Sequence, residues 1–233
     1  MKIAIIDYNA GNVASVANAL ERFGFEYTVT RDSYAILSAD KVIFPGQGRA
    51  GPAMKNLREA GLDETIRRIT KPFLGICLGM HLLFESSEED ETKCLGIIKG
   101  RVKKFREPGT KIPQIGWNTV VQTSFDSLYE NMPGTFYAYF VNSYYAETGK
   151  QNIIGNSQYG NTTLPSIVRK GNFYGIQFHS EKSGDIGLQL LKNFCELGMP
   201  KQKETLVIPA IDLIDGKCVR LRQGNYRNRK MYS

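Results

Sequence analysis

The sequence predicts an α/β fold built from parallel βαβ units, with both faces of the sheet covered. Short apolar runs alternate with amphipathic segments over about the first 95 residues. Two of the runs, KVIFPG (41–46) and FLGIC (73–77), are almost wholly apolar, as parallel strands buried on both faces are. From residue 96 to about residue 180 the pattern becomes strand-rich. Strands that alternate with helical segments in this way indicate parallel crossovers.

Each element follows in order from the spacing of its apolar residues. The predicted strands of the first part are 2–8, 27–30, 41–46 and 73–77. The predicted helices are 13–23, 51–69, 78–89 and 186–194, and the second of them is broken near Gly61. Further strands are predicted within 97–105, 115–122, 135–147, 152–160 and 165–178.

Cysteine and histidine content argues against two kinds of site. The chain has four cysteines, Cys77, Cys94, Cys195 and Cys218, and two histidines, His81 and His179. Because no CxxC pair occurs, neither a zinc site nor a disulfide scaffold is expected. The N-terminus reaches Asp7 after four apolar residues, and no apolar run is long enough to span a membrane. We expect a reduced, cytoplasmic protein without a membrane partner.

The net charge of +7 is concentrated in the C-terminal tail. Residues 1–200 carry 22 basic and 20 acidic side chains, whereas residues 201–233 carry 8 and 3. A balance of +2 over the body does not make the basic face that nucleic acid requires. No nucleic-acid partner is therefore expected.

Cys77 lies in the segment GICLG, between an apolar strand and a predicted helix. A free cysteine in an apolar run is often only a small buried side chain. Here the G-x-C-x-G pattern has the form of a nucleophile elbow, with glycines at 75 and 79 that allow close packing of strand and helix. The start of the helix would favour a thiolate through its dipole. The pattern therefore predicts a nucleophile.

His179 and Glu181 supply the groups that a thiolate nucleophile needs. His179 ends another apolar run, and Glu181 is two residues on, where a strand would place both side chains on one face. An HxE pair alone is a weak signal. The segment FPGQGRAG (44–51) and the N–H group of Leu78 are candidate oxyanion donors. Together these parts predict acyl transfer from a carbonyl compound.

Six motifs in this order resemble the class I (triad) glutamine amidotransferases, and among them the glutaminase subunit of imidazole glycerol phosphate synthase. The motifs are IDYNAGN, PGQG, GICLGMHLLFESSEE, IGWN, YFVNSYY and QFHSEKS, and the resemblance covers about residues 1–198. It implies a flavodoxin-like three-layer sandwich with a mixed, mostly parallel sheet. It also implies hydrolysis of glutamine to glutamate and ammonia, which passes to a (β/α)₈ synthase (cyclase) subunit of histidine biosynthesis. No metal or organic cofactor is implied.

The resemblance also assigns residues. The implied triad is Cys77, His179 and Glu181. The implied glutamine-binding residues are Gly46, Gln47, Gly48, Leu78, His81, Ser143 and Tyr144. The implied partner-facing residues are Asn12, Trp117, Tyr139 and Lys182.

Several positions depart from the family pattern. The family usually has Gln at His81, a hydrophobic residue at Gln47, His at Gln114 and Asn142, Pro at Ser180 and Gly at Asn9. These departures keep open a catalytically weak or silent partner subunit. A different amidotransferase branch, such as that of pyridoxal phosphate synthesis, and a peptidase or esterase with a cysteine elbow are also open at this point.

The tail resembles a second family. TLVIPAIDLIDGKCVRLRQGNY (205–226) is similar to the start of the phosphoribosyl-formimino isomerase of the same pathway, a (β/α)₈ barrel, and Asp212 matches its first-strand aspartate. We expect residues 199–204 to be a linker and 205–233 to be a truncated barrel fragment. Such a fragment cannot close a barrel of roughly 250 residues. It is expected to be disordered, docked on a sheet edge or swapped between chains, without isomerase activity.

Overall fold

The computed structural model describes the chain except residues 9–11, 107, 200–211, 215–216, 223–224 and 232–233. It divides into two units, Met1–Leu197 and Gly198–Ser233. The expected boundary at residue 198 lies next to this division.

The first unit is built on a nine-stranded mixed sheet in the order β2-β1-β3-β4-β13-β12-β11-β8-β9. Its strands are β1 (Lys2–Ile6), β2 (Glu26–Thr30), β3 (Lys41–Gly46), β4 (Phe73–Cys77), β8 (Gln114–Gln122), β9 (Thr135–Asn142), β11 (Ile153–Tyr159), β12 (Thr162–Lys170) and β13 (Phe173–Ile176). The first five strands in that order pair in parallel, and the remaining ones pair antiparallel. A smaller sheet joins β10 (Tyr144–Thr148), β7 (Gly100–Lys104), β5 (Ser86–Ser87) and β6 (Thr92–Lys93).

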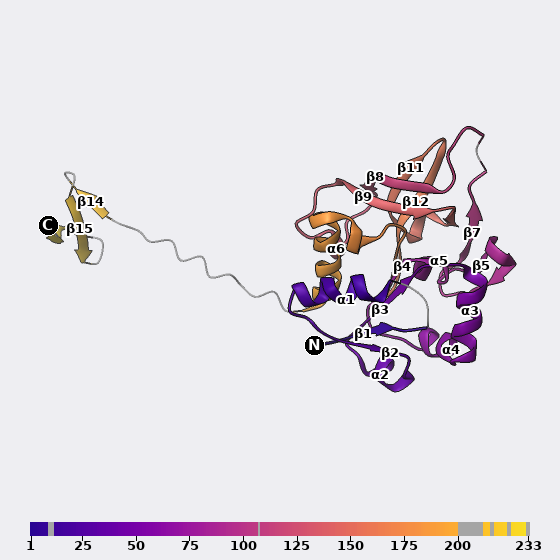
Figure 1. Ribbon diagram of the computed structural model, residues 1–233. Helices are drawn as coiled ribbons and strands as arrows, with labels where there is room; N and C mark the ends of the chain where they lie inside the picture. Colours follow the sequence, from indigo (N-terminus) through magenta and orange to yellow (C-terminus); the bar gives the residue numbers. More distant parts are fainter. Residues whose placement is uncertain (9–11, 107, 200–211, 215–216, 223–224, 232–233) are drawn as a thin grey trace. The chain divides into compact units, whose positions relative to one another are not determined.

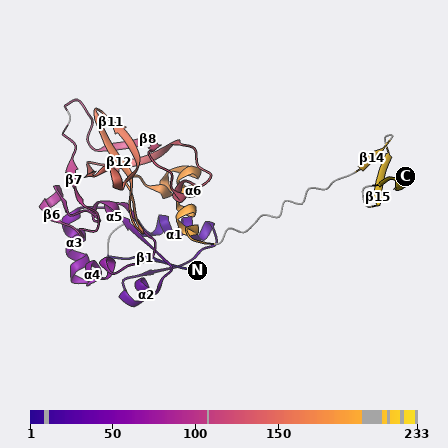
Figure 2. The ribbon, with the colours of Figure 1, turned by 180° about the vertical axis from the view of Figure 1, so that it is seen from behind.

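Helices cover both faces of the parallel strands, as the sequence predicts. The helices are α1 (Val13–Arg22), α2 (Ser33–Ser38), α3 (Ala50–Glu59), α4 (Leu62–Arg67), α5 (Leu78–His81) and α6 (Gly184–Glu196). In both views α1 and α6 lie on one side of β3 and β4, and α3 and α4 on the other (Figure 1, Figure 2). Alternate residues of the strands pack against the helices on opposite faces of the sheet. Ile43 packs with α1 and α6, whereas Phe44 packs with α2, α3 and α4.

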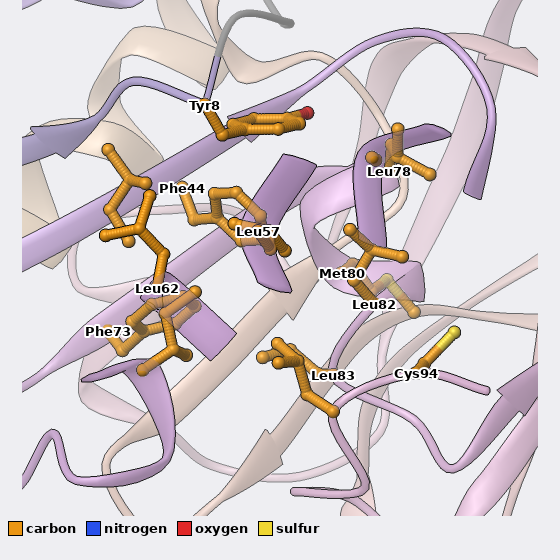
Figure 3. Close-up of a cluster of buried hydrophobic side chains, with 14 of the residues drawn as sticks. Tyr8, Phe44, Leu57, Leu62, Phe73, Leu78, Met80, Leu82, Leu83 and Cys94 are labelled. Carbon is orange, nitrogen blue, oxygen red and sulfur yellow. The ribbon is translucent and has the colours of Figure 1, made fainter. Parts of the chain in front are cut away.

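The core on the α3 side is densely aromatic at its centre. Figure 3 shows Tyr8, Phe44 and Phe73 with Leu57 and Leu62 in one cluster. The Tyr8 and Phe44 rings meet edge to face with centroids 5.0 Å apart. Burial of such rings stabilises the fold by about 2 kcal/mol each. This packing fixes β3 against β4, the two strands that carry the predicted site.

The predicted strands and the break near Gly61 are confirmed, but the helix predicted over 78–89 is wrong. The described helix is a single turn, Leu78–His81. Beyond it the backbone carbonyls of Leu82 and Leu83 accept hydrogen bonds from the segment at 95–98 instead of continuing the helix. These two side chains are fully buried. Helix α2 was not predicted.

The second unit contains an antiparallel sheet of β14 (Asp212–Ile214), β15 (Lys217–Arg222) and β16 (Asn225–Met231). Most of the expected linker and the expected barrel strand before Asp212 lie outside the described residues. The barrel fragment therefore stays a prediction.

Two findings concern membranes and metals. No helix within the described residues combines the length and the apolar character needed to cross a bilayer. In the same part of the chain, no three His, Cys, Asp or Glu side chains are grouped to hold a metal ion.

Candidate active site

Cys77 ends β4 in a strained turn that leads directly into α5. Its φ of 53° and ψ of −107° are rare for a residue with a side chain and cost of order 1–3 kcal/mol. The turn requires glycine at 79, where an added Cβ would collide with the carbonyl oxygen of Phe44 on β3. The predicted elbow is thus present. Because α5 has one turn only, its dipole contributes less to a thiolate than the sequence suggests.

His179 and Glu181 form a buried pair beside this cysteine. His179 Nδ1 lies 2.8 Å from Glu181 Oε1, and their side chains are 5% and 1% exposed. The pair forms as predicted, but the strand geometry from which it was predicted is wrong. Both residues follow β13, and Glu181 belongs to the 3-10 turn Ser180–Lys182 (η4) rather than to a strand. The turn folds the carboxylate back onto Nδ1 and leaves the other ring nitrogen for Cys77.

The electrostatics of His179 favour an imidazolium. Burial lowers its pKa, but hydrogen bonds to Cys77 and Glu181 and their negative charge outweigh burial and raise the pKa to about 10. At neutral pH the ring therefore carries a proton, which is the state that can protonate a leaving amine. Glu181 also accepts a hydrogen bond of 3.5 Å from Asn12 Nδ2. Its second oxygen, Oε2, is buried and without a partner.

A cavity of about 450 Å³ opens in front of the nucleophile. Most of the residues implied by the resemblance line it: Gln47, Gly48, Cys77, Leu78, His81, Ser143, Tyr144, His179 and Lys182. The lining also includes Glu89, Pro113, Val141 and Asn142, of which only Asn142 drew notice in the sequence, as a departure. Gly46 and Glu181 are not among the residues that line the cavity. Gly46 pairs with Cys77 across β3 and β4, which places the following Gln47–Gly48 segment beside the sulfur.

The four implied partner-facing residues divide into two groups. Trp117 and Tyr139 face each other across β8 and β9, with ring centroids 6.0 Å apart, and Trp117 is 58% exposed. Asn12 and Lys182 lie at the site itself, one bonded to Glu181 and the other lining the cavity. Tyr139 joins the groups, because its carbonyl accepts the N–H of His179 at 3.0 Å.

Four of the departures from the family pattern, at positions 81, 114, 142 and 180, are buried, whereas Gln47 is exposed. Gln114 and Asn142 are register partners on β8 and β9, and the side-chain oxygen of each has no hydrogen-bond partner. Ser180 is fully buried, and its hydroxyl is also unpaired. His81 Nε2 lies 2.7 Å from Gln177 Oε1, and Gln177 Nε2 lies 3.9 Å from Cys77 Sγ. Asn9 lies outside the described residues.

Comparison with known proteins agrees with this geometry. Residues 4–197 match the family described as glutamine amidotransferase class-I. The chain belongs to this family. It is 45% identical over 205 residues to the imidazole glycerol phosphate synthase subunit HisH of Dehalococcoides mccartyi strain CBDB1, a match that covers 86% of this chain and 100% of the relative. The HisH subunit of Methanocaldococcus jannaschii is 47% identical, covering 84% and 99%.

Solved structures show the same class I amidotransferase fold. A crystal structure of a glutamine amidotransferase aligns with a TM-score of 0.66 and 20% identity, covering 83% of this chain and 97% of that one. PurLQS from Thermotoga maritima aligns with a TM-score of 0.65 and 18% identity, covering 84% and 97%. The predicted fold class and the predicted family are therefore confirmed. The chain is a glutamine amidotransferase subunit of the HisH type.

Proposed function

We propose that Cys77, His179 and Glu181 hydrolyse the side-chain amide of L-glutamine, and that the ammonia passes to the synthase subunit of an imidazole glycerol phosphate synthase. The observation that carries the proposal is the buried His179–Glu181 pair beside the strained Cys77 elbow. A cavity of this size accommodates an amino acid.

The reaction follows from the roles of these groups. The Cys77 thiolate attacks the carboxamide carbon, and backbone N–H groups at Gln47–Gly48 and Leu78 stabilise the oxyanion. His179 transfers its proton to the amide nitrogen as the C–N bond breaks, which releases ammonia and leaves a glutamyl thioester. Water then attacks the thioester while His179 accepts its proton, and cleavage of the C–S bond releases glutamate. Glu181 orients the imidazole and stabilises its charge.

Glutamine itself is contacted through the cavity lining. Ser143 and Tyr144, at the turn from β9 to β10, are placed to hold the amino-acid backbone, and Gln47, Gly48 and Leu78 surround the carboxamide. His81 and Lys182 complete the implied set. None of these groups needs a metal or an organic cofactor for the chemistry proposed.

The partner surface we propose is the outer face of the β8–β9 hairpin. Its exposed apolar side chains are Ile115, Trp117, Val121, Tyr137 and Val141. They alternate with the buried residues that pack against α6, as expected of a two-sided hairpin. An apolar patch of this kind marks a protein interface, with Trp and Tyr as its strongest anchors. We propose that a (β/α)₈ synthase subunit covers it in the cytoplasm.

We further propose residues 1–198 as the amidotransferase domain, 199–204 as a linker and 205–233 as the start of an isomerase barrel. The division of the chain next to residue 198 supports this arrangement. The prediction is that the chain has no isomerase activity.

Protection of Cys77 from alkylation tests the proposed chemistry. The whole chain is treated with iodoacetamide, with and without L-glutamine, and the Cys77 peptide is quantified by mass spectrometry. We expect glutamine to slow alkylation of Cys77, while D-glutamine and L-leucine do not. Equal protection by all three amino acids would favour a generic cysteine hydrolase. If the synthase subunit is added and none of the three protects Cys77, a silent subunit would be favoured.

A further inference from the structure

Two buried polar side chains connect α5 to the nucleophile through the core of the site. His81 lies on α5, one turn beyond Cys77, and Gln177 follows β13, directly before Phe178 and His179. The exposed fractions are 5% for His81 and 0% for Gln177. Neither side chain has a place in the mechanism above beyond the lining role of His81.

We propose that His81 is a positioning residue, which holds the Gln177 amide so that its N–H group donates a hydrogen bond to the Cys77 sulfur. The proposal deepens the function proposed above and rests on Cys77 being its nucleophile. Two contacts carry it: His81 Nε2 is 2.7 Å from Gln177 Oε1, and Gln177 Nε2 is 3.9 Å from Cys77 Sγ.

The orientation of an amide matters because its two ends have opposite hydrogen-bond character. When Nε2 of His81 carries a proton, it donates to Oε1 of Gln177, and the NH₂ end of the amide must face the sulfur. A sulfur that faces an N–H donor is favoured as a thiolate. If the amide were reversed, its oxygen would face the sulfur and would favour the protonated thiol. The proton position on His81 therefore selects between a reactive and an unreactive arrangement of Cys77.

The buried surroundings of His81 keep its ring uncharged. Burial lowers the pKa of His81 to about 4, and the hydrogen bond to Gln177 raises it only in part. At neutral pH the ring is uncharged, with one proton to assign. Because Gln177 Oε1 can only accept, the proton belongs on Nε2. Other titratable groups that line the cavity with the sulfur are Glu89, Tyr144, His179 and Lys182. The buried Tyr8 is also close enough to Cys77 for a thiolate to raise its pKa.

This arrangement predicts which replacements of His81 are tolerated. In His81→Gln the new amide can donate to Gln177 Oε1 or, turned over, accept from its NH₂ group, so the orientation is kept only in part. In His81→Phe a ring of similar shape fills the space but offers no donor, so the Gln177 amide is free to reverse. Gln177→Leu removes the amide altogether.

The pH dependence of Cys77 alkylation tests the proposal in the full chain. The rate with iodoacetamide is measured from pH 5 to pH 10 on the Cys77 peptide, for wild type, His81→Gln, His81→Phe, Gln177→Leu and the double variant His81→Phe/Gln177→Leu. We expect the midpoint of His81→Gln to lie between those of wild type and His81→Phe, because its amide can donate to Gln177 or accept from it. We expect the alkylation midpoint of His81→Phe and of Gln177→Leu to lie about one pH unit higher, as loss of one hydrogen bond to a charged group implies.

The double variant separates positioning from simple packing. If His81 acts through Gln177, the double variant has the same midpoint as Gln177→Leu alone. The proposal is overturned if His81→Phe has the same alkylation midpoint as wild type. It is also overturned if His81→Phe shifts the midpoint as much in the Gln177→Leu background as in wild type. Far-UV circular dichroism checks that each variant is folded, and His81→Gln supplies the comparison if His81→Phe is not. Because alkylation needs no turnover, these outcomes are independent of whether glutamine is the substrate.

Discussion

The buried His81 makes the stability of this protein fall in mild acid. In the folded chain burial holds the pKa of His81 at about 4, against 6.5 for an exposed histidine. Above pH 6.5 the side chain is neutral in both states and has no effect. Between pH 6.5 and pH 4 the unfolded chain takes up a proton that the folded chain does not bind, so stability falls as the pH falls. The difference of about 2.5 pH units corresponds to a loss of about 3 kcal/mol.

His81→Gln is the perturbation that isolates this loss, because glutamine can bond to Gln177 but does not titrate. Urea unfolding is followed by far-UV circular dichroism for both proteins at pH 7.5, 6.0, 5.0 and 4.0. We expect the stability difference between them to change by about 3 kcal/mol over this range, with wild type losing more. His179 does not interfere, since a raised pKa of about 10 gives a contribution that is full below pH 6.5 and is lost only as the pH rises towards 10.

Carboxylates lose their own contributions in acid, but they do so equally in both proteins and cancel in the difference. A stability difference that stays constant from pH 7.5 to pH 4.0 would refute the reasoning, since His81 would then bind its proton equally in the folded and unfolded states.

Three further predictions concern the elbow, the triad and the partner surface. Gly79→Ala places a methyl group against the Phe44 carbonyl, so we expect a loss of about 2–3 kcal/mol in urea unfolding; Gly134→Ala, where nothing lies within 4 Å, is the matched control. In Glu181→Gln a neutral amide replaces the carboxylate on His179, so kcat for glutamate release should fall at least about tenfold with little change in KM, and an unchanged kcat would contradict the assigned role. Trp117→Ala should weaken binding of the synthase subunit in calorimetry by more than about tenfold, whereas Phe125→Ala, 99% exposed on a loop, should not.

The sequence predicts the fold well where one physical signal dominates. The apolar runs at 41–46 and 73–77 are buried parallel strands, as predicted, and Gly61, with a φ of 65°, does break the helix between residues 51 and 69. The segment after His81 fails because its apolar residues have helical spacing but its carbonyls bond to the segment at 95–98. Such long-range pairing leaves no local trace in the sequence.

The candidate site was also predicted only in part from the sequence. Motif and chemistry single out Cys77, His179 and Glu181, which lie together in the structure, and most of the implied glutamine-binding residues line the cavity. Gln177 was missed, because a glutamine in a strand-like run has no distinctive pattern, and its contacts come from residues about a hundred positions away. The position of Glu181 in a 3-10 turn was missed because the strand geometry was extended beyond Ile176, where β13 ends.

Transfer of nitrogen from glutamine to the synthase product tests the central claim most directly. The chain is mixed with a cognate synthase subunit and its nucleotide substrate, and supplied with amide-¹⁵N-glutamine or with ¹⁵N-ammonium. Wild type should label the imidazole product from either source, and Cys77→Ala only from ammonium. The assignment of Cys77 as the glutaminase nucleophile would be contradicted if Cys77→Ala labelled the product from glutamine. It would also be contradicted if the wild-type complex formed but labelled the product from ammonium alone.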